Sequence, residues 1–266
     1  MTAIATDTTG QQAPSTRITI NGVSKWYSTK NPVHAVDNVD LEIQDGEFVC
    51  LVGPSGCGKS TLLRMINGLS RPSDGYVEVA TDSGSLPTAM VFQDYSIFPW
   101  MTVEENVRFG LTRDIPKAEQ DRRVDKWLER MGLAAFRKHY PAALSGGMRQ
   151  RVAIARAIIV EPSVLLMDEP FAALDAQLRR VLQDELLAIW QENRRTVVFV
   201  THSLEEAILL GDRVVVMSTR PGKVAEDIRV PFPRPRTAEV RGTAEFAALE
   251  QQLWTLLAPQ LTDHEE

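Results

Sequence analysis

The stretch Gly53-Pro54-Ser55-Gly56-Cys57-Gly58-Lys59-Ser60-Thr61 decides the fold of this 266-residue chain. It fits the pattern G-x-x-x-x-G-K-S/T, in which glycines let the backbone curl so that successive N–H groups point at a phosphate. An apolar run, Phe48 to Val52, precedes the stretch, and a helical run from Leu62 to Ile66 follows it. Roughly one chain in a hundred would match this pattern by accident. The context therefore predicts a phosphate loop, with Lys59 on the β- and γ-phosphates and the Ser60 hydroxyl on Mg²⁺.

The hydrophobic pattern outside this loop indicates an α/β fold built on a parallel sheet. Further apolar runs alternate with helical segments, as buried parallel strands do; they are 164–167, 197–200 and 214–217. Residues 18–20 and 39–43 alternate instead, which is typical of antiparallel strands with one exposed face. The charged, strand-poor segment 95–144 predicts a helical insertion between two strands of the sheet.

Composition and charge exclude several classes of protein. The chain carries 29 Lys and Arg against 35 Asp and Glu, a net charge of −6, which argues against a stand-alone nucleic-acid binder. It contains no apolar run of about 18 residues, so the sequence predicts no membrane span. Met1 to Arg17 lacks a basic start and an apolar core, which favours a frayed tail over a secretory signal. Two cysteines do not make a disulfide framework, and they indicate a reducing compartment.

Helix-start signals divide the rest of the chain. Thr102 with Glu105, and Ser203 with Glu206, both fit the capping-box pattern, and Gly211 predicts the end of the second of these helices. A terminal helix is expected from Thr237 to Leu257. One of its faces is apolar, and we expect that face to pack on the body of the domain; it comprises Phe246, Leu249, Leu253 and Leu257.

Two acids end one of the buried strands. Asp168 and Glu169 directly follow the run 164–167, and ligands of open α/β sheets lie at the carboxyl ends of strands. We expect Asp168 to hold Mg²⁺ through water and Glu169 to polarise the attacking water. The alternative, two surface acids before a turn at Pro170, becomes minor beside a phosphate loop.

The segment Leu144-Ser145-Gly146-Gly147-Met148-Arg149-Gln150-Arg151 begins another helix. Ser145 is a good N-cap, and two glycines at a helix start expose backbone N–H groups to an anion. A capped helix with a flexible entry explains the same residues equally well, and from the residues alone the two interpretations stay open.

Taken together, the phosphate loop, Leu144 to Arg151 and Met167-Asp168-Glu169-Pro170 resemble the ATPase subunit of ABC transporters. The resemblance extends from about Thr19 to Met217. It implies ATP and Mg²⁺ as ligands, an antiparallel β subdomain at the N-terminus, and two ATPase subunits that close on each other. It also implies that Ser145, Gly146 and Gly147 contact the γ-phosphate of ATP bound to the other subunit.

The resemblance assigns roles to further residues. Tyr27 matches the aromatic that stacks on adenine, with Trp26 as the alternative; Gln93 matches the glutamine that touches Mg²⁺ and senses the γ-phosphate. Asp175 matches the loop that links the two sites, and His202 the switch histidine. His202 also follows an apolar strand, at the sheet edge where Glu169 and the phosphate loop are expected.

The predicted site residues fall into three overlapping sets. The catalytic set is Lys59, Gln93, Glu169 and His202. The nucleotide-binding set is Tyr27, Gly53, Pro54, Ser55, Gly56, Cys57, Gly58, Lys59, Ser60, Thr61, Gln93, Ser145, Gly146, Gly147, Asp175 and His202. The metal set is Ser60, Gln93 and Asp168.

Two positions depart from simple expectations. Met148 stands where the signature of the family usually has Gln, so a side-chain contact from that position to the nucleotide is not expected. Cys57 has no base beside it in sequence, so we interpret it as an incidental loop thiol rather than a nucleophile. A bulky thiol reagent on it would block nucleotide binding, and ATP would protect it.

The segment 96–103 is apolar in a region expected at the surface, which suggests a docking site; burial of Phe98 or Met101 under the helical insertion is the alternative. In the family, this region receives the membrane permease, so Gln93 to Thr102 is the expected contact. The segments 98–101, 219–223 and 231–236 resemble importers of nitrate, taurine and sulfonates. The resemblance implies a peripheral location on the cytoplasmic face of the membrane, and a solute-binding protein as an indirect partner.

The expected organisation is a tail over 1–16, an ATPase domain over 17–236 with a helical subdomain near 95–160, and a terminal helix and tail over 237–266. Alternative functions are another importer, an exporter, a soluble ABC ATPase of DNA repair or translation, or a nucleotide sensor without catalysis. Gln93, Glu169 and His202 argue against the sensor, which needs none of the three.

Overall fold

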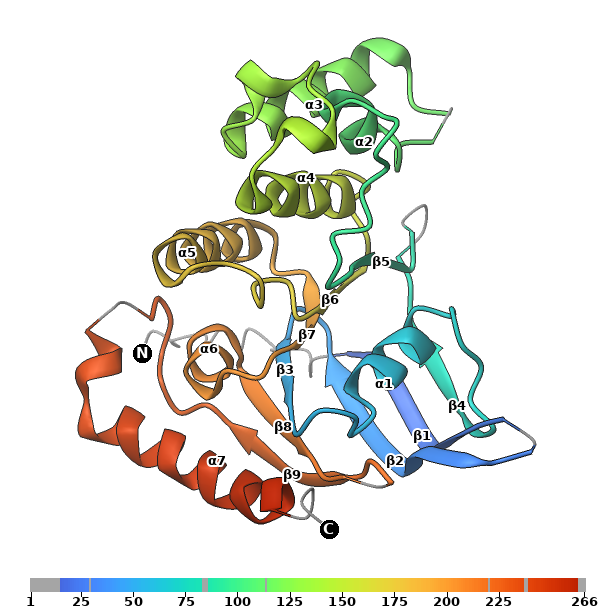
Figure 1. The fold of residues 1–266 in the computed structure, drawn as a ribbon, viewed down its shortest axis with the longest axis vertical. Coiled ribbons are helices and arrows are strands. Elements are labelled where there is room, and N and C mark those ends of the chain that lie inside the picture. The colour runs from blue at the N-terminus through green and yellow to red at the C-terminus, as the bar shows by residue number, and fades with distance from the viewer. Residues whose placement is uncertain are drawn as a thin grey trace, which may run out of the picture.

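The computed structural model describes residues 15–28, 30–82, 86–112, 114–219, 221–236 and 239–262. Most of the predicted N-terminal tail, residues 1–14, therefore lies outside the described residues. Two sheets organise the described part of the chain, and a group of helices projects from one end of the larger sheet (Figure 1).

The larger sheet has six strands in the order β5-β6-β7-β3-β8-β9. Five of them pair in parallel, and β9 pairs antiparallel with β8 at the edge. Its strands are β3 (Phe48–Val52), β5 (Thr88–Val91), β6 (Val164–Asp168), β7 (Thr196–Val200), β8 (Arg213–Met217) and β9 (Val224–Arg229). Every residue of β3, β6, β7 and β8 is buried, which confirms the interpretation of their apolar runs as two-sided core strands.

The smaller sheet is antiparallel, with the order β2-β1-β4. It consists of β1 (Thr16–Tyr27), β2 (Val33–Gln44) and β4 (Asp74–Val79). The alternating runs 18–20 and 39–43 lie in antiparallel strands, as predicted, and the structure pairs them with each other, with Ile18 opposite Ile43 and Ile20 opposite Leu41.

The described residues also form seven α-helices and three short 3₁₀ helices. The α-helices are α1 (Lys59–Ile66), α2 (Val103–Arg108), α3 (Lys117–Arg130), α4 (Gly146–Ile158), α5 (Ala176–Asn193), α6 (Leu204–Leu210) and α7 (Ala244–Thr262). The 3₁₀ helices are η1 (Ala134–Phe136), η2 (Pro141–Ala143) and η3 (Val240–Gly242). The predicted helical insertion is α2, α3 and α4, which lie between β5 and β6 in sequence and form the upper part of the molecule in Figure 1.

The alternation of side chains along β3 builds two hydrophobic cores. Val49 and Leu51 face the smaller sheet and α1, whereas Phe48, Cys50 and Val52 face the core shared with α5, α6 and α7. β3 is thereby packed on both faces, and the loop that follows Val52 leaves the sheet from a fully buried strand.

The terminal helix differs from its prediction at both ends. α7 begins at Ala244 rather than Thr237, because Thr243 accepts the backbone N–H of Phe246 and so caps the helix, and a 3₁₀ turn precedes it. The predicted packing is confirmed: Phe246, Leu249, Leu253 and Leu257 are all buried, and the helix lies along the side of the sheet formed by β8 and β9 (Figure 1).

Candidate nucleotide-binding site

The carboxyl ends of the parallel strands bring the predicted catalytic residues to one edge of the sheet. Leu51 is level with Val200, and Val91 with Met167, so the loops after β3, β5, β6 and β7 start side by side. One cleft at this edge is lined by Ala35, Ser55, Gly56, Gly58, Lys59, Ser60, Thr61, Gln93, Glu169 and His202. The sequence predicted all of these except Ala35, which belongs to β2.

The phosphate loop is shaped by its glycines. Gly58 has φ = +93°, and a Cβ there would lie 2.8 Å from the carbonyl oxygen of Ala35. A side chain would therefore strain the backbone and clash with β2. This left-handed residue is also the N-cap of α1, so the N–H groups of the first helical turn face the cleft.

Lys59 is held inside the loop. Its Nζ donates to the carbonyl oxygens of Gly53, at 2.7 Å, and Pro54, at 2.9 Å, and the residue is only 4% exposed. The chain thus places an ammonium group under the glycine turn, in an electrostatically positive position beside the N-terminus of α1.

Cys57 does not line the cleft. Its side chain is fully buried beneath the loop, with Sγ 3.5 Å from Lys59 Nζ. Burial raises the pKa of the Cys57 thiol, and the charge of Lys59 only partly opposes this. The thiol is therefore neither exposed nor activated, which agrees with the interpretation that it is no nucleophile.

Alkylation of the folded chain by N-ethylmaleimide at pH 7 should consequently be slow. Both Cys50 and Cys57 are buried with raised pKa values, so their reactive thiolate fraction lies below that of a free cysteine and grows as the pH rises. Mass spectrometry should find little adduct in native buffer and two adducts per chain after unfolding in guanidinium chloride. Rapid native labelling of Cys57 would contradict its burial.

Glu169 lies between two other residues of the predicted catalytic set. His202 Nε2 is 2.5 Å from Glu169 Oε1, and Gln93 Nε2 donates to Glu169 Oε2 at 3.1 Å. The backbone N–H of Glu169 donates to the carbonyl oxygen of Val200, and its φ of +46° turns the chain sharply away from β6. Three loops that are far apart in sequence therefore meet at one carboxylate.

Ser60 and Asp168 form a pair suited to magnesium. Ser60 Oγ donates to Asp168 Oδ1 at 2.8 Å, and Asp168 ends β6 almost completely buried. Hydroxyl and carboxylate oxygens are the ligands that Mg²⁺ prefers, together with phosphate oxygens and water. The residues present fit the ion, with Gln93 at the rim of the same cleft.

The two aromatic residues that could stack on adenine, Trp26 and Tyr27, have different surroundings. Trp26 stacks on His34, with ring centroids 3.5 Å apart, so one face of its indole is already covered. The hydroxyl of Tyr27 donates to Thr61 Oγ1 at 3.5 Å, which places this ring beside the phosphate loop.

Ser145, Gly146, Gly147 and Asp175 lie outside the cleft. Ser145 caps α4 by accepting the N–H of Met148 at 3.3 Å, as predicted. Gly147 packs so close to Leu178 of α5 that a Cβ would lie 2.2 Å from its Cδ2. Asp175 caps α5 by accepting the N–H groups of Gln177 and Leu178. A single chain thus places the phosphate loop and the Ser145-capped start of α4 apart from each other.

Sequence reasoning missed Asn106, which holds the loop predicted to dock a partner. This side chain is fully buried in α2; its Oδ1 accepts the N–H of Phe98, and its Nδ2 donates to the carbonyls of Phe98, Met101 and Thr102. The capping box of Thr102 and Glu105 is confirmed next to it. The signal in the sequence that could have identified Asn106 was its position on the buried side of a short helix.

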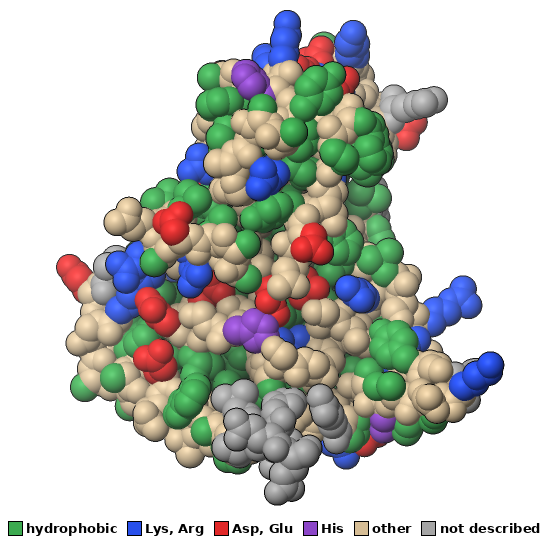
Figure 2. All heavy atoms as spheres, in the orientation of Figure 1, with side chains coloured by type: hydrophobic (Ala, Val, Ile, Leu, Met, Phe, Trp, Pro, Cys, Tyr) green, Lys and Arg blue, Asp and Glu red, His purple; other side chains and the backbone are tan. Residues whose placement is uncertain are grey.

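The loop presents an aromatic patch, which we define as Phe98, Trp100 and Phe109. Trp100 is 69% exposed and Phe109 57%, and both rings contact Phe98, which is half-buried under the guanidinium of Arg156. Hydrophobic side chains are visible on the surface of the α2–α4 part in the space-filling view (Figure 2). Within the segment 96–103, Trp100 is therefore exposed, whereas Phe98 and Met101 are partly buried.

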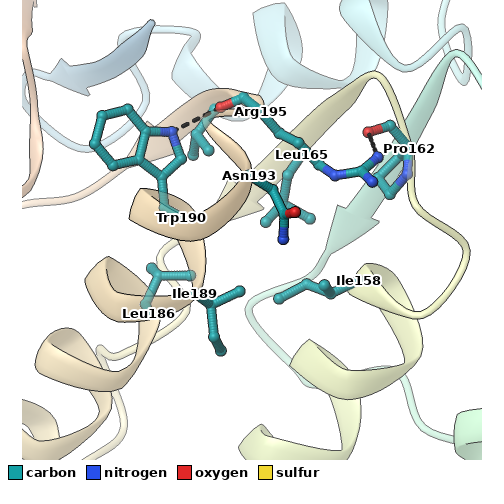
Figure 3. Close-up of a pocket in the computed structure, with 9 residues that line it drawn as sticks. Ile158, Pro162, Leu165, Leu186, Ile189, Trp190, Asn193 and Arg195 are labelled. Atoms are coloured by element: carbon teal, nitrogen blue, oxygen red, sulfur yellow. Dashed lines mark hydrogen bonds between the residues drawn. The ribbon is translucent and has the colours of Figure 1, made fainter. Parts of the chain in front are cut away.

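A second, apolar pocket lies away from this chemistry. Figure 3 shows it between α4, α5 and the start of β6 and β7, with Ile158, Leu165, Ile189 and Trp190 around it. Trp190 Nε1 donates to the carbonyl of Arg195, whose Nη1 donates to the carbonyl of Pro162. Because Glu169 and His202 follow the opposite ends of these strands, this pocket is no part of the nucleotide cleft.

The arrangement of strand, glycine loop, helix and strand-end carboxylates defines an ATPase of the phosphate-loop class. Residues 36–172 match the protein family described as ABC transporter. An uncharacterized ABC transporter ATP-binding protein of Methanocaldococcus jannaschii is 47% identical over 235 residues, covering 87% of each chain. An aliphatic sulfonates import ATP-binding protein of Bacillus cereus is 44% identical over 228 residues, covering 84% of this chain and 90% of the relative.

Solved structures agree with these relatives. A dimeric ATP-binding cassette in a post-hydrolysis state with ADP and Pi superimposes with a TM-score of 0.71 at 32% identity, covering 81% of this chain and all of the other. The chain belongs to the ABC transporter family, and it is an ATP-binding, ATP-hydrolysing transporter subunit. The predicted family, fold class and enzymatic activity are confirmed.

Proposed function

We propose that this subunit powers the import of a small anionic solute of the nitrate, taurine or sulfonate kind. Two copies bind ATP between them, so that the phosphate loop of one and Ser145 to Gly147 of the other enclose the γ-phosphate. The observation that supports this two-copy arrangement is that one chain places the phosphate loop inside the cleft and the Ser145-capped start of α4 outside it.

Within each cleft, the chain's own groups have separable roles. Lys59 and the start of α1 bind the phosphates, Tyr27 stacks on adenine, and Ser60, Asp168 and Gln93 hold Mg²⁺. Held by these residues, the ion would neutralise negative charge on the phosphates of ATP. Glu169 orients and polarises the attacking water, and His202 donates a hydrogen bond to the γ-phosphate.

Closure of the dimer supplies what one copy lacks. The N–H groups at the start of α4, capped by Ser145, add donors where negative charge develops, and the second subunit excludes water from the cleft. Asp175 begins α5 close to the same interface and links the two sites. Met148 is half-buried against the main core, which is consistent with a signature that works through its backbone and Ser145.

The aromatic patch and the loop from Gln93 to Thr102 supply the contact with a transmembrane permease. The loop joins Gln93 in the cleft directly to exposed Trp100, so closure around ATP moves the docking surface. Among the described helices, none is long and apolar enough to cross a membrane. We propose that contact with the permease attaches the subunit peripherally at the cytoplasmic face, with a solute-binding protein as an indirect partner.

The same proposal includes the division of the chain. Residues 17–236 form the ATPase domain with its helical subdomain near 95–160, and residues 237–266 form the terminal helix and tail. The importer assignment is supported by the 44% identity to a relative named for aliphatic sulfonates import.

The test is uptake by proteoliposomes that contain the full chain with its co-purifying permease and solute-binding protein. In vesicles that hold ATP in the lumen, with this subunit facing inward and the solute-binding protein added outside, labelled taurine and ethanesulfonate should accumulate, and labelled maltose should not. Transport from the side of this subunit to the opposite side would identify an exporter. ATP hydrolysis without any co-purifying permease, together with nucleic-acid binding, would favour a soluble ABC ATPase.

A further inference from the structure

A buried carboxyl group behind His202 has no role in the site as described so far. Glu206 lies on α6 and is only 5% exposed. It lines a cavity together with Glu169, Thr201, His202 and Ser203. A buried carboxyl group loses its hydration, so it is retained only where hydrogen bonds compensate that loss.

The partners of this carboxyl group differ from those of a capping box. In such a box, Glu206 would accept the backbone N–H of Ser203. Instead, Ser203 N donates to Thr201 Oγ1 at 3.0 Å, and Thr201 Oγ1 donates to Glu206 Oε2. The predicted capping box is therefore wrong in its second half, although Ser203 still caps α6 by accepting the N–H of Glu206.

These bonds secure the chain on both sides of His202. Thr201 precedes the histidine, and its N–H donates to the carbonyl of Leu51 in β3, one strand residue before the phosphate loop. Ser203 follows the histidine, and its N–H donates to the Thr201 hydroxyl. His202 itself reaches the cleft with a partly exposed imidazole that contacts Glu169. Its position therefore depends on how firmly Thr201 and Ser203 are held.

A third bond connects this turn with α5. Gln183 Nε2 donates to Glu206 Oε1 at 2.8 Å, and Gln183 is itself buried. α5 is the helix that Asp175 caps. The two oxygens of Glu206 thus join the turn of His202 to a second element of the proposed dimer interface.

We propose that Glu206 is a positioning residue for His202: its carboxyl group holds the Thr201 hydroxyl, and through it the backbone of Ser203, so that the imidazole stays at Glu169. This inference rests on the proposed catalytic role of His202. Burial raises the pKa of Glu206, which the hydrogen bonds from Thr201 and Gln183 oppose. Both carboxyl oxygens of Glu206 act as acceptors, and a glutamine keeps an acceptor oxygen of the same reach for Thr201.

The central comparison is Glu206→Leu against Glu206→Gln. Leucine fills the volume and keeps the Ser203 cap, but it leaves the Thr201 hydroxyl without its acceptor. We expect kcat for ATP hydrolysis to fall about 10- to 100-fold, because a small displacement of a catalytic group has effects of this order. Glutamine accepts from Thr201 while Gln183 turns its amide, so kcat should stay within about threefold of the wild type.

Two further variants sharpen the test. Thr201→Val removes the hydroxyl at the other end of the same bond without changing its size, and it should match Glu206→Leu in kcat. KM for ATP should stay within about threefold in both variants, because the phosphate loop is untouched. Glu205→Gln, on the same helix but ion-paired with Arg241 at the surface, is the matched control and should behave as wild type.

Dependence on His202 is measured by combining variants. If Glu206 acts through the histidine, adding Glu206→Leu to His202→Ala should lower kcat no further than His202→Ala alone. A further loss equal to that of the single Glu206→Leu variant would overturn the inference. Should Glu206→Leu fail to fold, adding Thr201→Val to the wild type and to His202→Ala gives the same comparison.

The outcomes separate this inference from the proposed function. Wild-type turnover of His202→Ala would remove the proposed role of the histidine itself. Loss of turnover in His202→Ala with wild-type turnover in Glu206→Leu and Thr201→Val would overturn the positioning role alone. A Glu206→Gln variant as impaired as Glu206→Leu would also overturn it, since the charge and not the hydrogen bond would then matter.

Discussion

The Glu169→Gln variant should bind ATP and fail to hydrolyse it. In the structure this carboxylate receives Gln93 Nε2 on one oxygen and approaches His202 Nε2 with the other. Glutamine has the same size and retains an acceptor, but it cannot take up a proton or polarise water as a base. Loss of a general base commonly costs about 10²- to 10⁴-fold in rate, and we expect a decrease of this size in phosphate release.

The same variant should accumulate as a closed dimer. Because hydrolysis removes the γ-phosphate that joins the two copies, its failure leaves ATP between them. Size-exclusion chromatography with ATP and Mg²⁺ should therefore show a dimer that persists, whereas the wild type returns to monomer as ATP is consumed. Glu226→Gln, at an exposed acid of β9, is the control. Wild-type turnover of Glu169→Gln would refute the role proposed for Glu169.

The Lys59→Ala variant should lose ATP binding itself. The ammonium group lies 2.7 Å and 2.9 Å from two loop carbonyls and is nearly buried, so it is already held within the loop that we propose binds the phosphates. Charge-assisted hydrogen bonds are worth about 1.5–3 kcal/mol each, so losing two of them lowers affinity on the order of 10²-fold or more. Titration with a fluorescent ATP analogue measures this loss directly.

Thermal unfolding distinguishes lost binding from lost folding. ATP stabilises only a native state that binds it, so saturating ATP should raise the Tm of the wild type and leave that of Lys59→Ala unchanged. Lys138→Ala, at an exposed lysine between η1 and η2, should respond to ATP as the wild type does. An unchanged affinity of Lys59→Ala would show that the lysine does not contact the phosphates.

Local patterns predicted those parts of the site that are contiguous in the chain. The phosphate loop, the strand that ends in Asp168 and Glu169, the Ser145 cap and the Thr102 capping box all appear where the sequence placed them. Each depends on residues within about a helical turn of one another, where sequence spacing determines which side chains and backbone groups meet. The apolar strands could also be predicted from the sequence, because a strand buried on both faces contains few polar residues.

The sequence by itself thus determined a phosphate-loop ATPase with a parallel core, and the kinds of residue that carry its chemistry. Only the tertiary structure decided that Glu169 meets both Gln93 and His202, that Trp26 is covered by His34, and that Glu206 turns from its expected cap to Thr201 and Gln183. These contacts join residues on different strands and helices, and their geometry follows from sheet order and register rather than from spacing along the chain. Where a side chain has two possible hydrogen-bond partners, the packed structure around it determines which bond forms, because burial removes the water that could replace either partner.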